Sequence, residues 1–196
     1  MLYTVGKVLV WLFFTLFFRV RVSGRENIPQ KGPFLLYANH IHALDMFLIA
    51  CKMKPRVHYM AKAELFRNKF LAFLLKHVGA FPVHRGKGDV GSIKTVYRLL
   101  DKGSVVGIFP EGTRTKKKDL TKKKGGAALM ALTSGVPILP VAVEGSFKLF
   151  SKLRVVYGEP FVLESKSQNE SGKYTKEELN EASVDILNRI YALIGQ

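Results

Sequence analysis

The fold of this chain is decided by residues 33–50, PFLLYANHIHALDMFLIA. Residues 33–38 are a short apolar run between Gly-Pro and Asn, which is typical of a buried β-strand. After a polar turn, residues 44–50 continue as a helix-like apolar stretch. In α/β proteins, functional side chains usually lie at the carboxyl end of such a strand. The stretch therefore predicts an α/β fold with a site in residues 39–45.

The rest of the chain repeats this alternation of strands and helices. Further apolar runs predict strands at 56–60, 80–84, 104–109, 137–143 and 154–157. Apolar residues recur at helical spacing in residues 71–75 and 90–100. Thr175 with Glu178 three residues later is a capping box that begins a final helix. We expect a single α/β domain whose mixed, mostly parallel sheet is flanked by helices.

Composition narrows the class of protein. The 196 residues include 31 Lys+Arg and 15 Asp+Glu, a net charge of +16, yet 47% are hydrophobic. That hydrophobic content excludes a disordered basic tail, and the length is short of the roughly 250 residues of a (β/α)₈ barrel. The charge indicates a polyanionic partner: nucleic acid, an anionic membrane surface, an acidic protein or a phosphorylated substrate. The single cysteine, Cys51, excludes a disulfide framework and a CxxC site.

The N-terminal segment is strongly apolar. Residues 1–18 contain one charge, Lys7, and residues 8–18 read VLVWLFFTLFF. As a helix this segment would be about 27 Å long, slightly short of a hydrocarbon core of about 30 Å. The following Arg-Val-Arg-Val disfavours a signal peptide, which would have a small-residue cleavage site. Its many aromatic residues disfavour a buried core helix. We interpret it as a membrane anchor that dips into the bilayer or barely crosses it.

This interpretation divides the chain into an anchor, residues 1–24, and an α/β domain, residues 25–196. If the anchor crosses the bilayer, Arg19, Arg21 and Arg25 place the domain on the cytosolic side. An apolar anchor beside a basic domain favours an anionic membrane surface as the polyanion, with nucleic acid second.

His40 and Asp45 are the candidate catalytic pair. With His40 in the turn and Asp45 in the first helical turn, the carboxylate can fold back to the imidazole and leave the other ring nitrogen free as a general base. No G-x-S-x-G motif supplies a nucleophile, and burial is the favoured reading of Cys51, so the base would activate a hydroxyl of the substrate. His42 makes a metal site conceivable, but no further ligand pair is evident, and we predict none.

Four segments in order resemble the motif blocks of one family. They are His40-x4-Asp45, Gly79–Arg85 (GAFPVHR), Phe109–Arg114 (FPEGTR) and Val136–Val141 (VPILPV), and residues 61–66 (AKAELF) resemble the segment between the first two. These blocks are similar to those of the glycerolipid acyltransferases, and the match is best with the 1-acylglycerol-3-phosphate acyltransferases. It covers roughly residues 25–160. His42 and Ala43 lie at variable positions, and Pro82 replaces the commoner Ile.

The resemblance implies transfer of a fatty acyl group from a thioester of coenzyme A or acyl carrier protein to the sn-2 hydroxyl of 1-acylglycerol-3-phosphate, which gives phosphatidic acid. His40 would be the base and Asp45 would orient it. The thioester is a substrate, so no cofactor is implied. The resemblance also implies a phospholipid-synthesis enzyme at the cytoplasmic face of the cell membrane. Another lysophospholipid or glycerol phosphate as acceptor is the alternative.

The acceptor's phosphate requires fixed cations. Lys62, Arg85 and Arg114 are the candidates, because Arg offers a bidentate fork to phosphate and these residues recur at the ends of strands. Glu111 would support a cation or contact the glycerol. Gly112 would allow the backbone to approach closely.

Two other features allow other readings. Residues 86–91 (GKGDVG) match the dinucleotide-binding pattern G-x-G-x-x-G, but the chain is short for that fold, so a loop or an auxiliary phosphate contact is favoured. Lys116–118 and Lys122–124 suit anionic lipid or an acidic carrier protein. A basic nucleic-acid-binding protein is the non-enzyme alternative, disfavoured because no aromatic residues are interleaved with these lysines. A catalytically silent lipid-binding relative is disfavoured because His40 and Asp45 are both present.

Overall fold

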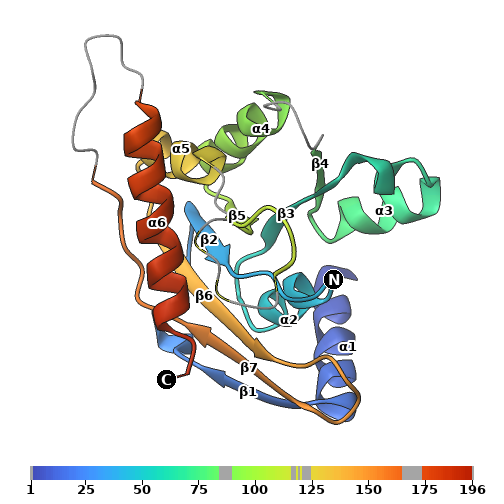
Figure 1. Cartoon of the computed structure of the whole chain (residues 1–196). Helices are drawn as coiled ribbons and strands as arrows, with labels where there is room; N and C mark the ends of the chain where they lie inside the picture. The colour runs from blue at the N-terminus through green and yellow to red at the C-terminus, as the bar shows by residue number, and fades with distance from the viewer. Residues whose placement is uncertain are drawn as a thin grey trace.

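The computed structural model describes residues 2–83, 90–115, 118, 120, 125–164 and 174–195 (Figure 1). Its elements follow the order α1 (Leu2–Phe17), β1 (Arg19–Ser23), η1 (Arg25–Asn27), β2 (Phe34–Ala38), α2 (Asp45–Ala50), β3 (Val57–Lys62), η2 (Ala63–Phe66), α3 (Lys69–His77), β4 (Phe81–Val83), α4 (Val90–Asp101), β5 (Val105–Ile108), α5 (Gly125–Ser134), β6 (Ile138–Gly145), β7 (Lys152–Tyr157) and α6 (Lys176–Ala192).

The strands form one seven-stranded mixed sheet in the order β1-β7-β6-β2-β5-β3-β4. Strands β6, β2, β5, β3 and β4 are parallel to one another. Strand β7 is antiparallel to β6, and β1 is parallel to β7. The predicted single α/β domain with a mostly parallel sheet is therefore confirmed, and each of the six predicted strands corresponds to one of β2–β7.

The sheet is covered by helices on both faces. Along β2, Leu36 packs with α1 and α2 on one face, and Leu35 and Tyr37 pack with α4, α5 and α6 on the other. Burial on both faces explains why the strand has no polar residue, since a half-exposed strand would alternate. The Tyr37 hydroxyl is satisfied within this core, because it donates to the Ala127 carbonyl at 2.7 Å.

The hydrophobic N-terminal segment is a 16-residue helix, α1, that packs on the domain through one side only. Phe14 is buried in the core, whereas Val8, Leu12 and Leu16 are exposed. No helix in the described part of the chain is long and apolar enough to cross a membrane.

The residues that follow α1 belong to the sheet. Residues 19–23 lie inside the range assigned from the sequence to the anchor, but they form the edge strand β1, paired with β7. The alternation Arg-Val-Arg-Val is the pattern of such a strand, since the two valines pack against the core while both arginines face outward. From the sequence, these arginines are expected to flank a membrane anchor, whereas they lie in a strand of the sheet.

Candidate active site

The predicted site residues follow the carboxyl ends of neighbouring parallel strands. His40 comes two residues after β2, Lys62 ends β3, and Glu111 and Arg114 follow β5. Because β2, β3 and β5 run in the same direction, their carboxyl ends share one edge of the sheet. His40, Lys62, Glu111 and Arg114 therefore follow or end parallel strands on the same side of the sheet, as the sequence predicts.

The His40 imidazole is held by the buried carboxylate of Asp45. Nδ1 of His40 lies 2.9 Å from Oδ2 of Asp45, and the same oxygen accepts the backbone N–H groups of Ile41 at 2.7 Å and His42 at 2.8 Å. These three contacts all fall on Oδ2 of a carboxylate that is fully inaccessible to solvent, whereas its Oδ1 is buried without a hydrogen-bond partner among the described residues. An ionised carboxylate only accepts hydrogen bonds, so Nδ1 is the protonated nitrogen and Nε2 presents its lone pair.

The ring of His40 is fixed from a second direction by Phe109, which follows β5. The two rings are stacked with centroids 4.0 Å apart and an angle of 18° between planes. Asn39 anchors the preceding residue, because its side chain donates to the Val143 carbonyl at 2.8 Å and accepts the Val143 N–H at 2.7 Å. The side chain of His40 is 10% exposed, so the ring reaches solvent although its contacts hold it in place.

Glu111 lies beneath the backbone of His40. Its Oε2 accepts the Thr115 hydroxyl at 2.6 Å and the His40 backbone N–H at 3.4 Å, and its Oε1 accepts the Tyr191 hydroxyl of α6 at 3.0 Å. Thr115 also donates its backbone N–H to the His40 carbonyl at 2.7 Å. Glu111 is 1% exposed, so its carboxylate is a buried support for the loop that contains His40, residues 39–44.

The electrostatics of Glu111 are those of a buried acid. Burial raises the pKa of its carboxyl above the ordinary 4.5, and the hydrogen bonds from Thr115, Tyr191 and the His40 backbone partly oppose that rise. Gly112 closes the turn formed by residues 109–112, because its N–H donates to the Phe109 carbonyl at 2.9 Å. Its φ is +68°, a value that glycine adopts without strain.

Replacing Glu111 by glutamine should change stability in a pH-dependent way. Below pH 4.5 the wild-type carboxyl is neutral in the folded and unfolded states, so its raised pKa costs nothing. As the pH rises through that pKa, the wild type loses free energy of unfolding and Glu111→Gln does not. The free energy of unfolding is measured by urea at about pH 3.5 and at pH 7.5; the wild type should lose stability relative to Glu111→Gln at the higher pH, and a stability difference that does not change with pH would contradict this.

Glu111→Ala is the matched comparison for the same network. Glutamine keeps an oxygen that can accept from His40 and Thr115, whereas alanine leaves the buried His40 N–H and the Thr115 and Tyr191 hydroxyls without this partner. We expect the alanine variant to lose about 3 kcal/mol of stability and to have lower activity than the glutamine variant.

The predicted phosphate ligands are only partly described. Lys62 and Arg114 are exposed at the carboxyl edge of the sheet, and neither forms an ion pair with a described residue. Arg85 comes two residues after β4 in the sequence and lies outside the described residues. Residues 86–89 of the G-x-G-x-x-G match also lie outside the described residues. Of the six lysines in residues 116–124, only Lys118 is described, and it is exposed.

An apolar cavity is lined in part by the first residues of α2 that follow Asp45. Its volume is about 290 Å³, and its lining is contributed by α1, α2, β3, α3 and the residues between α3 and β4. Met46 and Phe47, the two residues after Asp45, are part of this lining. So is Tyr59, whose ring is nearly parallel to that of Phe109 at 6.0 Å. The cavity therefore begins next to the residues that position His40.

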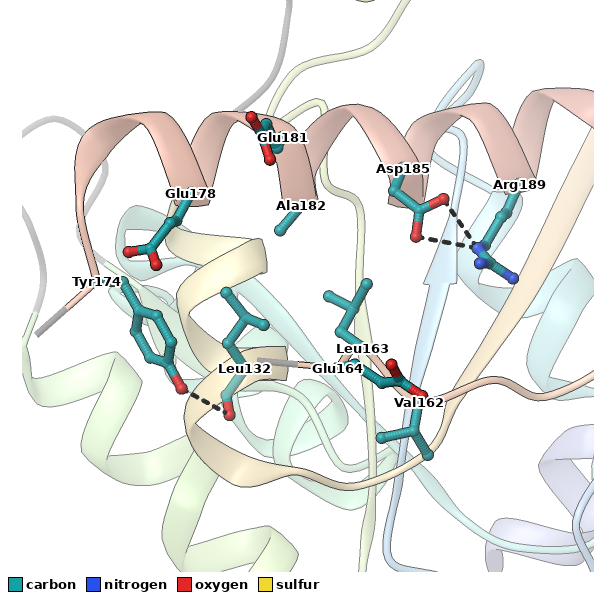
Figure 2. A pocket seen from close by; sticks show the side chains of 10 residues that line it. All are labelled: Leu132, Val162, Leu163, Glu164, Tyr174, Glu178, Glu181, Ala182, Asp185 and Arg189. Atoms are coloured by element: carbon teal, nitrogen blue, oxygen red, sulfur yellow. Dashed lines mark hydrogen bonds and ion pairs between the residues drawn. The ribbon is translucent and has the colours of Figure 1, made fainter. Parts of the chain in front are cut away.

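A second, larger groove, of about 430 Å³, has the opposite character (Figure 2). Its lining includes four carboxylates, from Glu164, Glu178, Glu181 and Asp185. Figure 2 also shows Asp185 paired with Arg189 along α6, at 3.0 Å. None of the predicted site residues lines this groove, and its acidic lining does not suit a phosphorylated substrate.

His42 does not join His40. Its ring is stacked on Phe147 with centroids 4.2 Å apart, and its Nδ1 accepts the Leu44 N–H at 3.3 Å. Within the described ranges there is no group of three or more His, Cys, Asp or Glu side chains arranged to hold a metal ion. Cys51 is buried, and burial raises the pKa of its thiol to about 11, which disfavours the reactive thiolate.

Two residues of the site were missed in the sequence. Thr115 and Tyr191 bind Glu111, but each reads as an ordinary loop or helix residue. Tyr191 carried no detectable signal, because it lies 80 positions from Glu111 in a helix predicted only from its apolar face. Thr115 directly follows the quoted block that ends at Arg114, which was its only signal.

The fold and the site together define an α/β enzyme with a His–Asp pair at the carboxyl edge of its sheet. The model of the Acyltransferase family matches residues 19–144, which is more than half of the chain. The chain belongs to this family, and the predicted identity as an O-acyltransferase is confirmed.

Within the family, several similar proteins are 1-acyl-sn-glycerol-3-phosphate acyltransferases, and a lyso-ornithine lipid O-acyltransferase of Pseudomonas aeruginosa is also similar, at 33% identity over 127 residues. The 1-acyl-sn-glycerol-3-phosphate acyltransferase of Bacillus subtilis is 39% identical over 147 residues, covering 72% of this chain and 73% of the relative. That of Borreliella burgdorferi is 32% identical over 149 residues, covering 74% of this chain and 58% of the relative. The crystal structure of the 1-acyl-sn-glycerophosphate (LPA) acyltransferase PlsC from Thermotoga maritima matches with a TM-score of 0.73 and 25% identity, over 99% of this chain and 80% of that one.

Proposed function

We propose that this protein transfers a fatty acyl group from an acyl thioester to the sn-2 hydroxyl of 1-acylglycerol-3-phosphate, which gives phosphatidic acid. The donor is a thioester of coenzyme A or acyl carrier protein. The observation that carries the proposal is the 2.9 Å contact between His40 Nδ1 and Asp45 Oδ2, which leaves Nε2 free at the sheet edge of a chain from this family.

In the proposed reaction His40 acts as the general base. Nε2 takes the proton of the acceptor hydroxyl while its oxygen attacks the thioester carbonyl and forms a tetrahedral intermediate. The intermediate collapses with cleavage of the carbon–sulfur bond, and the proton on Nε2 passes to the departing thiolate. Asp45 keeps the proton on Nδ1 and stabilises the imidazolium that forms between the two steps. The acyl group passes directly to the acceptor, so no acyl-enzyme forms.

Arg114, Lys62 and Arg85 are proposed to bind the acceptor's phosphate, with Gly112 shaping the turn beneath it. Lys62 and Arg114 are supported by their exposure at the carboxyl ends of the strands, because a cation that forms no ion pair with a described residue is available to a dianion. Glu111 supports this site by holding the histidine loop, and its burial argues against direct contact with the glycerol.

Arg114→Ala should raise the KM for the lysophospholipid by about tenfold or more, because a charge-assisted bidentate contact to phosphate is lost. The KM for the acyl donor should change little. Steady-state kinetics with each substrate varied in turn distinguish the two, and Arg85→Ala is measured in the same way. Lys31→Ala is the control, since Lys31 is an exposed cation before the amino end of β2. An unchanged KM for the acceptor in Arg114→Ala would remove it from the phosphate site.

The apolar cavity beside α2 is proposed to hold the acyl chain that is transferred. Its lining is almost wholly apolar and includes Met46 and Phe47, the two residues after Asp45, which supports a chain whose thioester end is directed toward His40. An apolar cavity is a favourable environment for a hydrocarbon chain, which gains about 0.8 kcal/mol for each methylene removed from water.

We also propose that α1 attaches the protein to the cytoplasmic face of the cell membrane by lying in the interface. The exposed side of α1 is mostly apolar: apart from Thr4 and Thr15, it consists of Val5, Val8, Leu9, Leu12, Phe13, Leu16 and Phe17. Such a helix binds in the plane of the interface, and the net charge of +16 adds attraction to anionic lipid.

The function is tested by incubating the purified full chain with lysophosphatidic acid and an acyl thioester in detergent or lipid. Phosphatidic acid should form with at least one of the two donors and should be resolved by thin-layer chromatography. Comparing palmitoyl-coenzyme A with palmitoyl-acyl carrier protein, against a small panel of lysophospholipids, identifies both substrates. Product formation with other lysophospholipids and none with lysophosphatidic acid would overturn the proposed acceptor.

A further inference from the structure

Helix α3 has its apolar side turned outward. Phe70 is 72% exposed and Phe73 is 54% exposed, and Leu74 and Val78 are also exposed. Only Leu75 of α3 is buried, in a small cluster with Ala61 and Ala80. Exposed phenylalanines on adjacent turns of one helix form a contiguous apolar patch that is unusual for a surface in contact with water.

The surroundings of this patch are basic. Between residues 46 and 80 the chain has seven Lys or Arg residues and one acidic residue, Glu64. Lys69 and Lys76 lie on α3 itself, and Arg67 directly precedes its N-cap residue. An exposed apolar helix face with flanking cations is complementary to an anionic lipid surface, where the side chains enter the acyl region and the cations meet phosphate.

The patch on α3 is connected to the exposed side of α1. Leu9 of α1 and Leu74 and Val78 of α3 line the same apolar cavity. Arg56 joins the two helices, because its Nη2 donates to the Lys76 and His77 carbonyls at 2.9 and 2.6 Å while its guanidinium lies 5.3 Å from the centre of the Tyr3 ring. In Figure 1, α1 and α3 both lie on the right side of the molecule.

We propose that α3 is a second membrane-binding element, which inserts Phe70 and Phe73 into the interface of an anionic bilayer. With α1 bound beside it, the two helices flank the apolar cavity, so that an acyl chain passes between bilayer and cavity without crossing water. This inference rests on the proposed function for the direction of that passage, but the membrane contact of α3 is independent of catalysis.

The test uses the full chain with the double substitution Phe70→Ser and Phe73→Ser, which adds no charge. Binding is measured by co-sedimentation with vesicles of phosphatidylcholine and phosphatidylglycerol in equal amounts. The variant should bind at least about tenfold more weakly than wild type, because two large apolar side chains no longer leave water. Val8→Ser with Leu16→Ser should weaken binding through α1, and Val162→Ser, at an exposed apolar position in the acidic groove, should not.

Activity separates the membrane contact from the catalytic site. On a short-chain lysophosphatidic acid dissolved as a monomer, the α3 variant should match wild type, since neither phenylalanine lines the cavity. On lysophosphatidic acid embedded in vesicles its rate should fall. If wild type forms no product with either substrate, the proposed function fails, but the vesicle-binding result still decides the role of α3.

Other outcomes overturn the proposal. Vesicle binding by the α3 variant that equals that of wild type would overturn it. If the variant also had a raised KM for acyl-acyl carrier protein, this face would instead be the docking surface of the donor. If the double variant does not fold, Phe70→Trp in a Trp11→Phe background replaces it: insertion predicts a blue-shifted emission and quenching by brominated lipid. Unchanged emission on adding vesicles would overturn the proposal.

Discussion

Replacing His40 by alanine is expected to lower kcat for acyl transfer by about a thousandfold. The imidazole is the one side chain held by Asp45 with a nitrogen left free, and the stacked ring of Phe109 fixes its direction. Without it, no described group is positioned to take the acceptor's proton, and general-base catalysis contributes about 10²- to 10⁴-fold in enzymes. Initial rates of phosphatidic acid formation, at saturating concentrations of both substrates, measure the loss.

The structure offers a matched control for this substitution. His42 lies two residues away, but its ring is stacked on Phe147, and its contact with Asp45 is made by the backbone N–H, which alanine retains. His42→Ala should therefore stay close to the wild-type rate. Wild-type activity in His40→Ala, with the fold intact by circular dichroism, would exclude His40 as the base.

Replacing Asp45 by asparagine is the second large effect that we expect, with a fall in kcat of about 10²- to 10⁴-fold. The amide has no negative charge to stabilise the imidazolium. The amide oxygen is expected to take the place of Oδ2, because an NH₂ group there would face the N–H donors of Ile41 and His42; Nδ1 then keeps its proton, and the loss of activity comes from the missing charge. Since Asp45 is fully buried and does not reach the substrate, the KM for the acceptor should change much less than kcat.

Stability measurements separate this electronic role from a loss of structure. Asparagine can still accept the N–H groups of Ile41 and His42 through its oxygen, so the melting temperature should fall only modestly. Asp45→Ala removes the acceptor of both groups and of the imidazole, and should lose about 3 kcal/mol of stability. If Asp45→Asn kept its kcat, the carboxylate would have a purely structural role.

Glu111 lies in a sequence motif, but the motif does not predict what its side chain contacts. The sequence placed it in a block with Arg114 and predicted contact with a cation or with glycerol. In the structure its carboxylate is 1% exposed and bonded to the His40 backbone, Thr115 and Tyr191. The block marks a functional region correctly, whereas the partner of each side chain depends on which elements cover it.

The N-terminal segment shows a different limit. Its apolar composition predicts a helix, and α1 is one, but composition does not say which side of the helix faces the domain. Phe14 and Phe18 are buried in the core and Val10 and Trp11 are half-buried, while the apolar residues on the other side of the helix, such as Val8 and Leu16, are exposed. Deleting residues 1–18 would therefore damage the core as well as any membrane contact, so exposed positions such as Val8 and Leu16 are the ones to substitute.

The sequence by itself determined the strand–turn–helix stretch at residues 33–50 and the pair formed by His40 and Asp45. These features are local: a five-residue spacing across a turn into a helix brings the two side chains together without help from the rest of the chain. It also determined the family, because four blocks in order are a pattern that residues alone carry.

Only the tertiary structure decided which distant groups support that pair. The stacking of Phe109 on His40 depends on β2 and β5 being neighbours in the sheet, and the Tyr191–Glu111 bond joins residues 80 positions apart. Hydrophobic periodicity gives each element its buried face, but it does not give the order of the strands or the helix that covers each face. Those follow from packing all the elements at once, and with them the exposed sides of α1 and α3 that we assign to the membrane.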